Sequence, residues 1–117
     1  MAHLSKTFLK TLHETVEKHL DDSDLDVKKL TRLLGMSRTD LHRKITAYAG
    51  MSITAYIRKI RLEKASCLLR DKPEICISCI MRDTGFNHPS YFTKRFKEMF
   101  GMCPNSFRKY AHNPTIP

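Results

Sequence analysis

The sequence predicts an all-α protein with about seven helices, and two observations carry this prediction. Apolar residues recur at steps of three and four, and no segment shows the two-residue alternation of a strand. The four glycines, and the prolines of "DKPE", "NHPS" and "MCPN", fall between these apolar runs, where helices end or begin. Glycine and proline residues therefore mark the limits of the expected helices.

The first expected helix is amphipathic and ends near the acidic stretch "DDSD". Its apolar stripe consists of Phe8, Leu9, Leu12, Val16 and Leu20. A short second helix, "VKKLTRLL", follows Asp26, whose carboxylate suits an N-cap. Leu25 and Leu30 are spaced to pack across the start of this helix. Gly35 is expected to end it with a positive φ.

Serine caps mark the next two helices. Ser37 precedes "RTDLHRKITAYA", and Asp40 completes a pattern similar to a capping box. Leu41 and Ile45 form the inner stripe of this helix, and glycine follows it at position 50. Ser52 precedes the longest helix, "ITAYIRKIRLEKASCLLRD", which "DKPE" ends. Its Ile57, Ile60, Leu68 and Leu69 are expected to pack inward.

Three more helices are expected in the second half. One covers residues 77–84 and is ended by Gly85. The next begins at His88-Pro89, where proline suits a first turn, and runs to Phe100 with Phe92 and Phe96 inside. A short helix opens at proline 104. Met51 and Met102 are expected in the core.

The two halves repeat one pattern. "GMSITAYIRK" near the middle resembles "GMCPNSFRKY" near the end. Further matched pairs are Leu30 with Ile80, Gly35 with Gly85, Leu41 with Phe92, Arg43 with Lys94, and Ile45 with Phe96. The offset grows from 50 to 51 after the glycine, so the second copy has one extra residue in its turn. Each copy has a short helix, a glycine turn and a helix with a basic outer face, the order of a helix-turn-helix unit.

The repeat suggests a domain layout. We expect a first helix-turn-helix subdomain over residues 1–50, a linker helix over 51–71, a second subdomain over 72–112, and a flexible tail over 113–117. A helix of about 19 residues rises about 28 Å, close to the spacing of about 34 Å between successive major grooves. The linker could therefore hold both units on one duplex.

Positive charge is concentrated in the two repeated segments. Residues 36–64 hold seven basic and two acidic residues, and residues 82–117 hold six basic and two acidic ones. The rest of the chain is balanced, so these blocks supply the whole net charge of +9. Such a distribution favours a polyanionic partner over a uniformly solvated surface.

Residues left outside the apolar stripes are the candidate DNA contacts. On the first outer face they are Arg38, Thr39, His42 and Arg43, with Lys44 at the flank. On the second they are His88, Ser90, Tyr91, Lys94 and Arg95, with Lys97 further along. Arginine and lysine donate to guanine, and serine and threonine suit either base. Arg58 and Arg61, early on the linker, are expected to touch the DNA backbone.

Four cysteines are present, and Cys76 and Cys79 form a C-x-x-C motif. In "ICISCI" the cysteines alternate with isoleucine, which favours small apolar filling of a buried segment. Zinc binding and redox chemistry remain alternatives, although Cys67 and Cys103 complete no familiar zinc spacing. We expect no metal and no cofactor.

At this point the residues resemble the DNA-binding domain of the AraC/XylS family of bacterial transcription regulators. The resemblance rests on "GMSRTDLHRKI", "AYIRKIRLEKASCLL" and "TGFNHPSYFTKRFKEMFGMCPNSFRKY" and covers about residues 5–111. It implies a homeodomain-like fold with two helix-turn-helix units bridged by a helix. The family's base-reading positions correspond to Arg38, Thr39, His42, Arg43, His88, Pro89, Ser90 and Lys94. Its linker and C-terminal arginines correspond to Arg61 and Arg108, while Thr31 and Met81 replace its usual small alanines.

The resemblance implies sequence-specific binding of double-stranded DNA in transcription regulation, with RNA polymerase as a possible further partner. We expect an activator, with a repressor as the alternative. The segment is expected to be cytoplasmic, monomeric, without a membrane partner, and typical of the C-terminal part of a larger, for example two-component, regulator. A nonspecific nucleic-acid-binding or architectural protein is the alternative. An enzyme is not expected, because no catalytic or nucleotide-binding motif is present.

Overall fold

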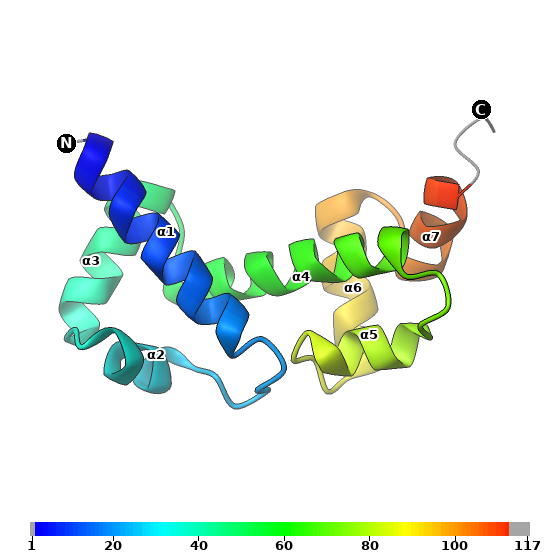
Figure 1. The fold of residues 1–117 in the computed structure, drawn as a ribbon, viewed down its shortest axis with the longest axis horizontal. Helices are drawn as coiled ribbons and strands as arrows, with labels where there is room; N and C mark the ends of the chain where they lie inside the picture. Colours follow the sequence, from blue (N-terminus) through cyan, green and yellow to red (C-terminus); the bar gives the residue numbers. More distant parts are fainter. Residues whose placement is uncertain (1, 113–117) are drawn as a thin grey trace. The chain divides into compact units, whose positions relative to one another are not determined.

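The computed structural model describes residues 2–112, with side chains from residue 6 onward. This part of the chain contains seven α-helices and no strand, which confirms the all-α prediction. In order they are α1 (Ala2–Lys18), α2 (Val27–Leu34), α3 (Arg38–Ala49), α4 (Ile53–Asp71), α5 (Ile77–Asp83), α6 (Pro89–Phe100) and α7 (Pro104–His112) (Figure 1). The predicted flexible tail, residues 113–117, lies outside the described residues.

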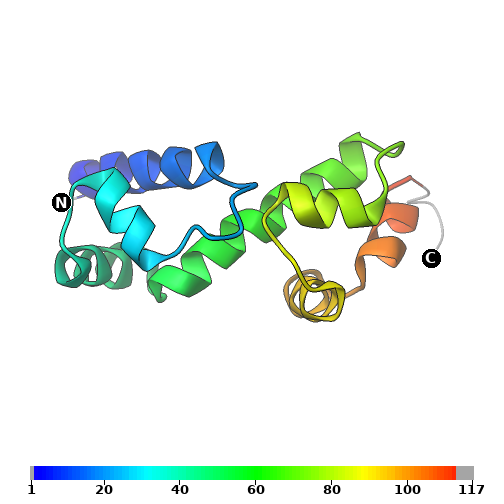
Figure 2. The same ribbon diagram turned by 90° about the horizontal axis from the view of Figure 1, so that it is seen from below.

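The chain forms two compact units, Met1–Ile60 and Arg61–Pro117. The division falls inside α4, so the first half of this helix belongs to one unit and the second half to the other. In the first unit α1, α2 and α3 all contact one another; in the second, α6 contacts both α5 and α7 (Figures 1 and 2). Each unit therefore contains one helix pair of the predicted repeat, α2–α3 or α5–α6.

Side-chain caps start three helices where the sequence predicts. The Asp26 carboxylate accepts the Lys29 backbone N–H at 2.9 Å, and Ser37 Oγ accepts that of Asp40 at 3.1 Å. Ser52 Oγ accepts the N–H of Ala55 at 3.1 Å. Each bond satisfies a donor that has no partner inside its own helix.

The two turns use the same backbone arrangement. Gly35 and Gly85 have φ values of 66° and 87°. Residues with a Cβ rarely adopt this backbone conformation. Next to the first glycine, Met36 N–H donates to Thr31 O at 3.0 Å; next to the second, Phe86 N–H donates to the carbonyl of residue 81 at 2.9 Å. The bonds are 50 residues apart at both ends, so the internal repeat extends to the hydrogen bonds of the turn.

The core of the first unit is aliphatic. Its most deeply buried members, all with no exposed surface, are Leu12, Val16, Leu30, Leu41 and Ile45. α4 adds Ile53, Tyr56, Ile57 and Ile60. The first three helices thus close over one face of the start of α4, and the predicted inner stripes of α1 and α3 are confirmed.

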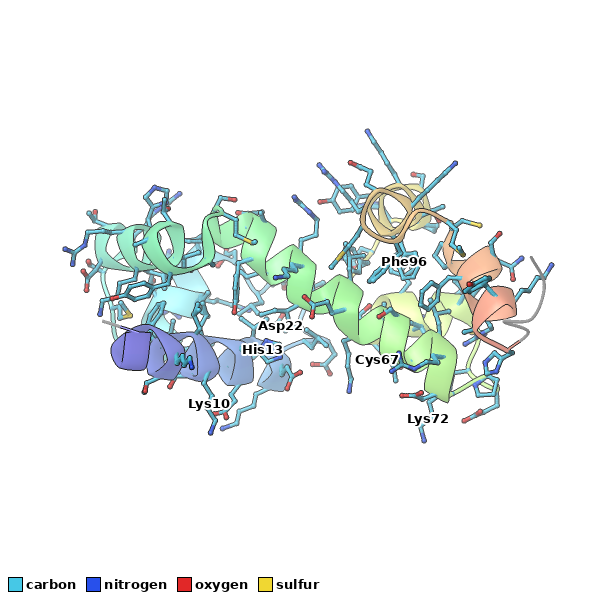
Figure 3. All side chains as sticks on the ribbon, turned by 90° about the horizontal axis from the view of Figure 1, so that it is seen from above. Lys10, His13, Asp22, Cys67, Lys72 and Phe96 are labelled. Carbon is cyan, nitrogen blue, oxygen red and sulfur yellow. The ribbon has the colours of Figure 1, made fainter. Side chains whose placement is uncertain are left out.

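The core of the second unit is largely aromatic. Phe96 has no exposed surface, and its ring centroid lies 4.6 Å from that of Phe100 and 5.3 Å from that of Phe107 (Figure 3). Phe92 continues the cluster toward Phe86 at 5.0 Å. Offset and edge-on ring pairs of this kind add to the burial of apolar area. This cluster packs α5, α6 and α7 together with Leu62, Ala65 and Leu69 of α4.

Two residues predicted to lie in the core are less buried than expected. Met51 is only half-buried and packs at the edge of the first core, and Met102 is half-buried outside both core clusters. Both follow a helix-ending glycine, so the chain is already turning toward solvent there. Met81, in contrast, is only 7% exposed inside the second core, so the bulky side chain is accommodated.

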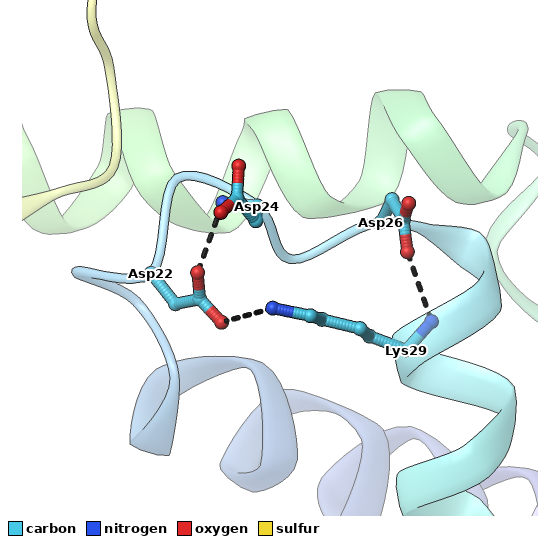
Figure 4. A network of polar contacts seen from close by, with 4 residues as sticks. All are labelled: Asp22, Asp24, Asp26 and Lys29. Carbon is cyan, nitrogen blue, oxygen red and sulfur yellow. Dashed lines mark hydrogen bonds and ion pairs between the residues drawn. The ribbon is translucent and has the colours of Figure 1, made fainter.

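A polar network joins the end of α1 to α2 (Figure 4). Asp22 accepts the Asp24 backbone N–H at 2.9 Å and the Lys29 ammonium at 3.1 Å. The bond from Lys29 lowers the pKa of Asp22 below its usual 3.8. The carboxylate is therefore charged at neutral pH, and the contribution of this ion pair is lost only as the pH falls through that lowered value.

The N-cap of α2 gives a stability test. Asp26→Ala removes the acceptor for the Lys29 N–H and should lower the free energy of unfolding by about 1 kcal/mol. Urea unfolding followed by circular dichroism measures the change. The control Asp21→Ala alters an exposed carboxylate of the same loop and should stay within about 0.5 kcal/mol of the original protein. Equal losses in both variants would contradict the capping role.

Candidate nucleic-acid interface

One face of α3 packs inward, and the opposite face is therefore exposed to solvent. Leu41 and Ile45 have no exposed surface, and their spacing turns the positions between them outward. The exposed side chains include Arg38, Thr39, His42 and Arg43, while Lys44 is half-buried. All five predicted contact residues of α3 therefore lie on or beside one accessible helix face.

Two of these cations share one carboxylate. Arg43 forms a short ion pair with Asp40, and Lys44 Nζ lies 4.0 Å from the other Asp40 oxygen. The bond from Arg43 lowers the pKa of the Asp40 carboxyl, so Asp40 is charged at neutral pH. The Arg43 side chain is still 73% exposed. A phosphate or a guanine edge can therefore replace the carboxylate at the guanidinium.

A hollow of about 330 Å³ opens beside this face. Its lining residues are Val27, Arg38, Thr39, His42, Ser52, Ile53 and Thr54. It brings together three predicted base-contacting residues of α3 and the capped start of α4. Backbone N–H groups at a helix start favour anions, so the hollow combines cationic, hydroxyl and amide donors.

The outer face of α6 is built in the same way. Phe92 is 1% exposed and Phe96 is fully buried, which leaves the opposite positions accessible. The exposed side chains include His88, Pro89, Ser90, Tyr91, Lys94 and Lys97. His88 is the N-cap residue but makes no side-chain capping bond, and the proline after it starts the helix. The His88 imidazole is therefore not used by the cap.

Arg95 is the least accessible predicted contact on α6. Its guanidinium lies 5.4 Å from the Tyr91 ring centroid and 3.7 Å from a Glu98 oxygen. Its Nε is buried and has no hydrogen-bond partner among the described residues. The side chain is therefore held along the helix surface, with only part of its guanidinium exposed.

Arg61 is buried, whereas the sequence predicted an exposed side chain that contacts the DNA backbone. It is 5% exposed, and its Nη1 donates to the buried carbonyl of Thr84 at 2.9 Å. Contact with the DNA backbone does not fit this burial, because the guanidinium is occupied inside the second unit. The spacing Ile57–Arg61–Ala65–Leu69 places Arg61 on a buried stripe, and this pattern could have revealed its role. Arg58, three residues earlier, is half-buried and remains a candidate contact.

Arg108 also has a structural role that the sequence does not reveal. Its Nε donates to Leu69 O at 3.3 Å and its Nη2 to Lys72 O at 3.2 Å. Both acceptors lie at the end of α4, where carbonyls lack partners within the helix. Arg108 therefore joins α7 to the C-terminus of α4.

The prediction that Cys76 and Cys79 fill a buried segment is wrong. Cys76 is exposed and is the N-cap residue of α5, and Cys79 is only half-buried. Neither fills a buried segment as expected, because α5 turns Ile80 and Met81 inward instead. Among the described residues, no three His, Cys, Asp or Glu side chains converge to hold a metal.

Within the described residues, no helix is both long enough and apolar enough to cross a membrane.

Comparison with known families identifies the fold. A family model described as "Helix-turn-helix domain" matches residues 30–110, which include parts of both units. The chain belongs to this AraC-type helix-turn-helix family. This family consists of DNA-binding domains of transcription regulators, and the matched domain is not itself an enzyme.

Three relatives of this AraC-type domain show how far the likeness extends. The HTH-type transcriptional activator RhaR of Yersinia pseudotuberculosis is 34% identical over 110 residues, 93% of this chain and 36% of RhaR. The C-terminal domain of AraT, a response regulator from Geobacillus stearothermophilus, is 32% identical with a TM-score of 0.76, covering 86% of this chain and 82% of that one. An AraC-type transcriptional regulator from Chromobacterium violaceum shares the fold, with a TM-score of 0.83 at 24% identity over 94% of this chain and 96% of that one.

The AraC-type domain matches only part of its curated relatives. It spans between 8% and 36% of the length of the first four. What those longer proteins sense or bind elsewhere in their chains therefore does not transfer to this domain by similarity.

The two linker arginines allow a paired test. Arg61→Met removes a buried charged donor and should lower the free energy of unfolding by about 1.5–3 kcal/mol, without changing how DNA affinity depends on salt. Arg58→Met should leave stability nearly unchanged and reduce the magnitude of the salt slope by about 1 if Arg58 contacts phosphate. Urea unfolding and fluorescence anisotropy at several salt concentrations measure both. A reduced slope for Arg61→Met would contradict the structural role.

Proposed function

We propose that the domain reads one DNA site with α3 and α6 placed in successive major grooves. The observation that carries this proposal is the duplication of one surface. In each unit two fully or nearly fully buried apolar residues lie beneath an exposed face with matched cations, Arg43 on α3 and Lys94 on α6. The continuous 19-residue α4 supports the proposal, because a helix of this length rises about 28 Å, comparable with a groove spacing of about 34 Å.

The exposed residues divide into two proposed roles. Base contacts fall to residues near the start or on the open face of each helix: Arg38, Thr39, His42 and Arg43 on α3, and His88, Pro89, Ser90 and Lys94 on α6. Phosphate contacts fall to side chains at the flanks: Lys44, Arg58, Arg95 and Lys97. The 330 Å³ hollow supports the first group, because three of its members line it together. Contacts to phosphate position the protein, whereas contacts to base edges specify the sequence.

The biological setting is inferred from relatives. RhaR is named as an activator, which supports activation through contact with RNA polymerase. AraT is named as a response regulator whose C-terminal domain matches this chain, which supports a role as the DNA-binding output of a longer, two-component type of regulator. We place this activity in the cytoplasm, where bacterial DNA is found. The domain is proposed to bind as a monomer, because each unit buries its own core.

Selection from a random library of DNA duplexes tests the two-groove mode. The expected result is one enriched motif with two conserved clusters about ten base pairs apart. The complex should also survive an excess of random duplex, since specific sites exceed nonspecific ones by roughly 10³-fold or more in affinity. A motif with a single cluster would leave the family assignment intact but would contradict simultaneous binding by α3 and α6.

The matched cations can then be tested on the selected site. Arg43→Ala should cost roughly 1–3 kcal/mol and relax the preference at one base pair, because a bidentate contact to guanine is lost. Lys44→Ala is the matched control: its proposed phosphate contact predicts a similar fractional loss on every sequence. Anisotropy with single-base variants of the site distinguishes the two. A uniform loss for Arg43→Ala would assign that residue to phosphate instead.

A further inference from the structure

The C-x-x-C pair at the start of α5 has no part in the proposed DNA interface. Cys76 is exposed, and its sulfur accepts the Cys79 backbone N–H at 3.3 Å as the N-cap of the helix. The two sulfur atoms lie 2.8 Å apart. A turn of helix thus holds two thiols side by side at the surface, where small molecules reach them.

This geometry disfavours a metal site. A tetrahedral zinc with bonds of about 2.3 Å to each sulfur requires the sulfurs to lie about 3.8 Å apart. Zinc also needs further ligands, and no third His, Cys, Asp or Glu joins the pair among the described residues. A disulfide needs sulfurs about 2.05 Å apart, so only a small closing movement separates the pair from a covalent bond.

The surroundings of the pair favour thiol–disulfide exchange. The bond from Cys79 lowers the pKa of the Cys76 thiol, and Cys76 is also the more exposed of the two. The same bond raises the pKa of the Cys79 thiol, and Arg82 Nη2, which lies 3.7 Å from the Cys79 sulfur, offsets only part of this rise. An accessible first thiol beside a second thiol in reach is the arrangement that exchange requires.

The other cysteines lack this arrangement. Cys67 and Cys103 are half-buried, and neither is bonded to another cysteine within the described residues. Cys103 is paired with the Ser106 hydroxyl at 3.2 Å. Neither therefore has a resolving thiol beside it, and both can be replaced when the pair is tested.

We propose that Cys76 and Cys79 form a reversible redox pair that a low-molecular-weight disulfide oxidises to an intrachain disulfide. The Cys76 thiolate attacks one sulfur of the small disulfide, forming a mixed disulfide and releasing one thiolate. The Cys79 thiolate then attacks Cys76 Sγ, which forms the 76–79 bond and releases the second thiolate. The two cysteines lose two protons and two electrons, which convert the small disulfide into two thiols.

The test uses oxidised glutathione as the probe and a Cys67→Ser/Cys103→Ser background that keeps only the pair. Intact-mass spectrometry should show the loss of two hydrogens, with both thiols blocked to iodoacetamide and both restored by dithiothreitol. In the same background, Cys79→Ser is the matched control. It should keep one glutathione on Cys76, because no second thiol is present to displace it.

Three outcomes would overturn the proposal. They are free thiols in the background variant after oxidation, a lasting glutathione adduct on Cys76, or a disulfide that joins two chains. Should the serine background fail to fold, peptide mapping of the oxidised natural chain makes the same distinction, since a 76–79 link and a glutathione adduct give different peptide masses.

Discussion

The structure depends on the way α4 is divided between two cores. Its first half buries Ile53, Ile57 and Ile60 in an aliphatic core, and its second half buries Leu62, Ala65 and Leu69 against an aromatic one. If either half were exposed to solvent, one unit would lose the α4 side chains that form part of its core. Because burial of a single such side chain contributes about 1.5–3 kcal/mol, the helix is stabilised along its whole length by the units that it connects. A continuous linker is therefore a consequence of packing.

The DNA-binding surface follows from the same packing. In α3 and α6 the apolar pairs Leu41–Ile45 and Phe92–Phe96 are committed to the interior, and helical geometry turns the remaining positions outward. The short α2 and α5 provide the surface on which these pairs pack. Glycine turns with positive φ keep each bracing helix close to its partner. The positions of the exposed cations are thus determined by side chains that never touch DNA.

The sequence predicts those features that depend on local chemistry. Helix limits, caps and turns were predictable because Asp26, Ser37 and their neighbours act over three or four residues. The apolar stripe around Arg61 could have indicated its burial, but not its partner, because the carbonyl of Thr84 lies 23 residues away. The exposure of Cys76 escaped prediction for a similar reason: alternation with isoleucine does not show which face of α5 packs inward. The exposure of the candidate contact residues on α3 and α6 was foreseeable, whereas the partners of buried polar groups needed the tertiary structure.

Asp40 shows how the fold and the DNA interface compete for the same cations. Its carboxylate lies in the first turn of α3, where negative charge stabilises the helix, and it holds both Arg43 and Lys44. The same charge repels phosphate, so it weakens sequence-independent attraction to DNA. A guanine edge offers Arg43 two acceptors without a full negative charge beside Asp40. In the proposed binding mode, the carboxylate therefore penalises nonspecific contact with phosphate more than contact with the correct base, and an acidic residue within a basic surface favours specificity.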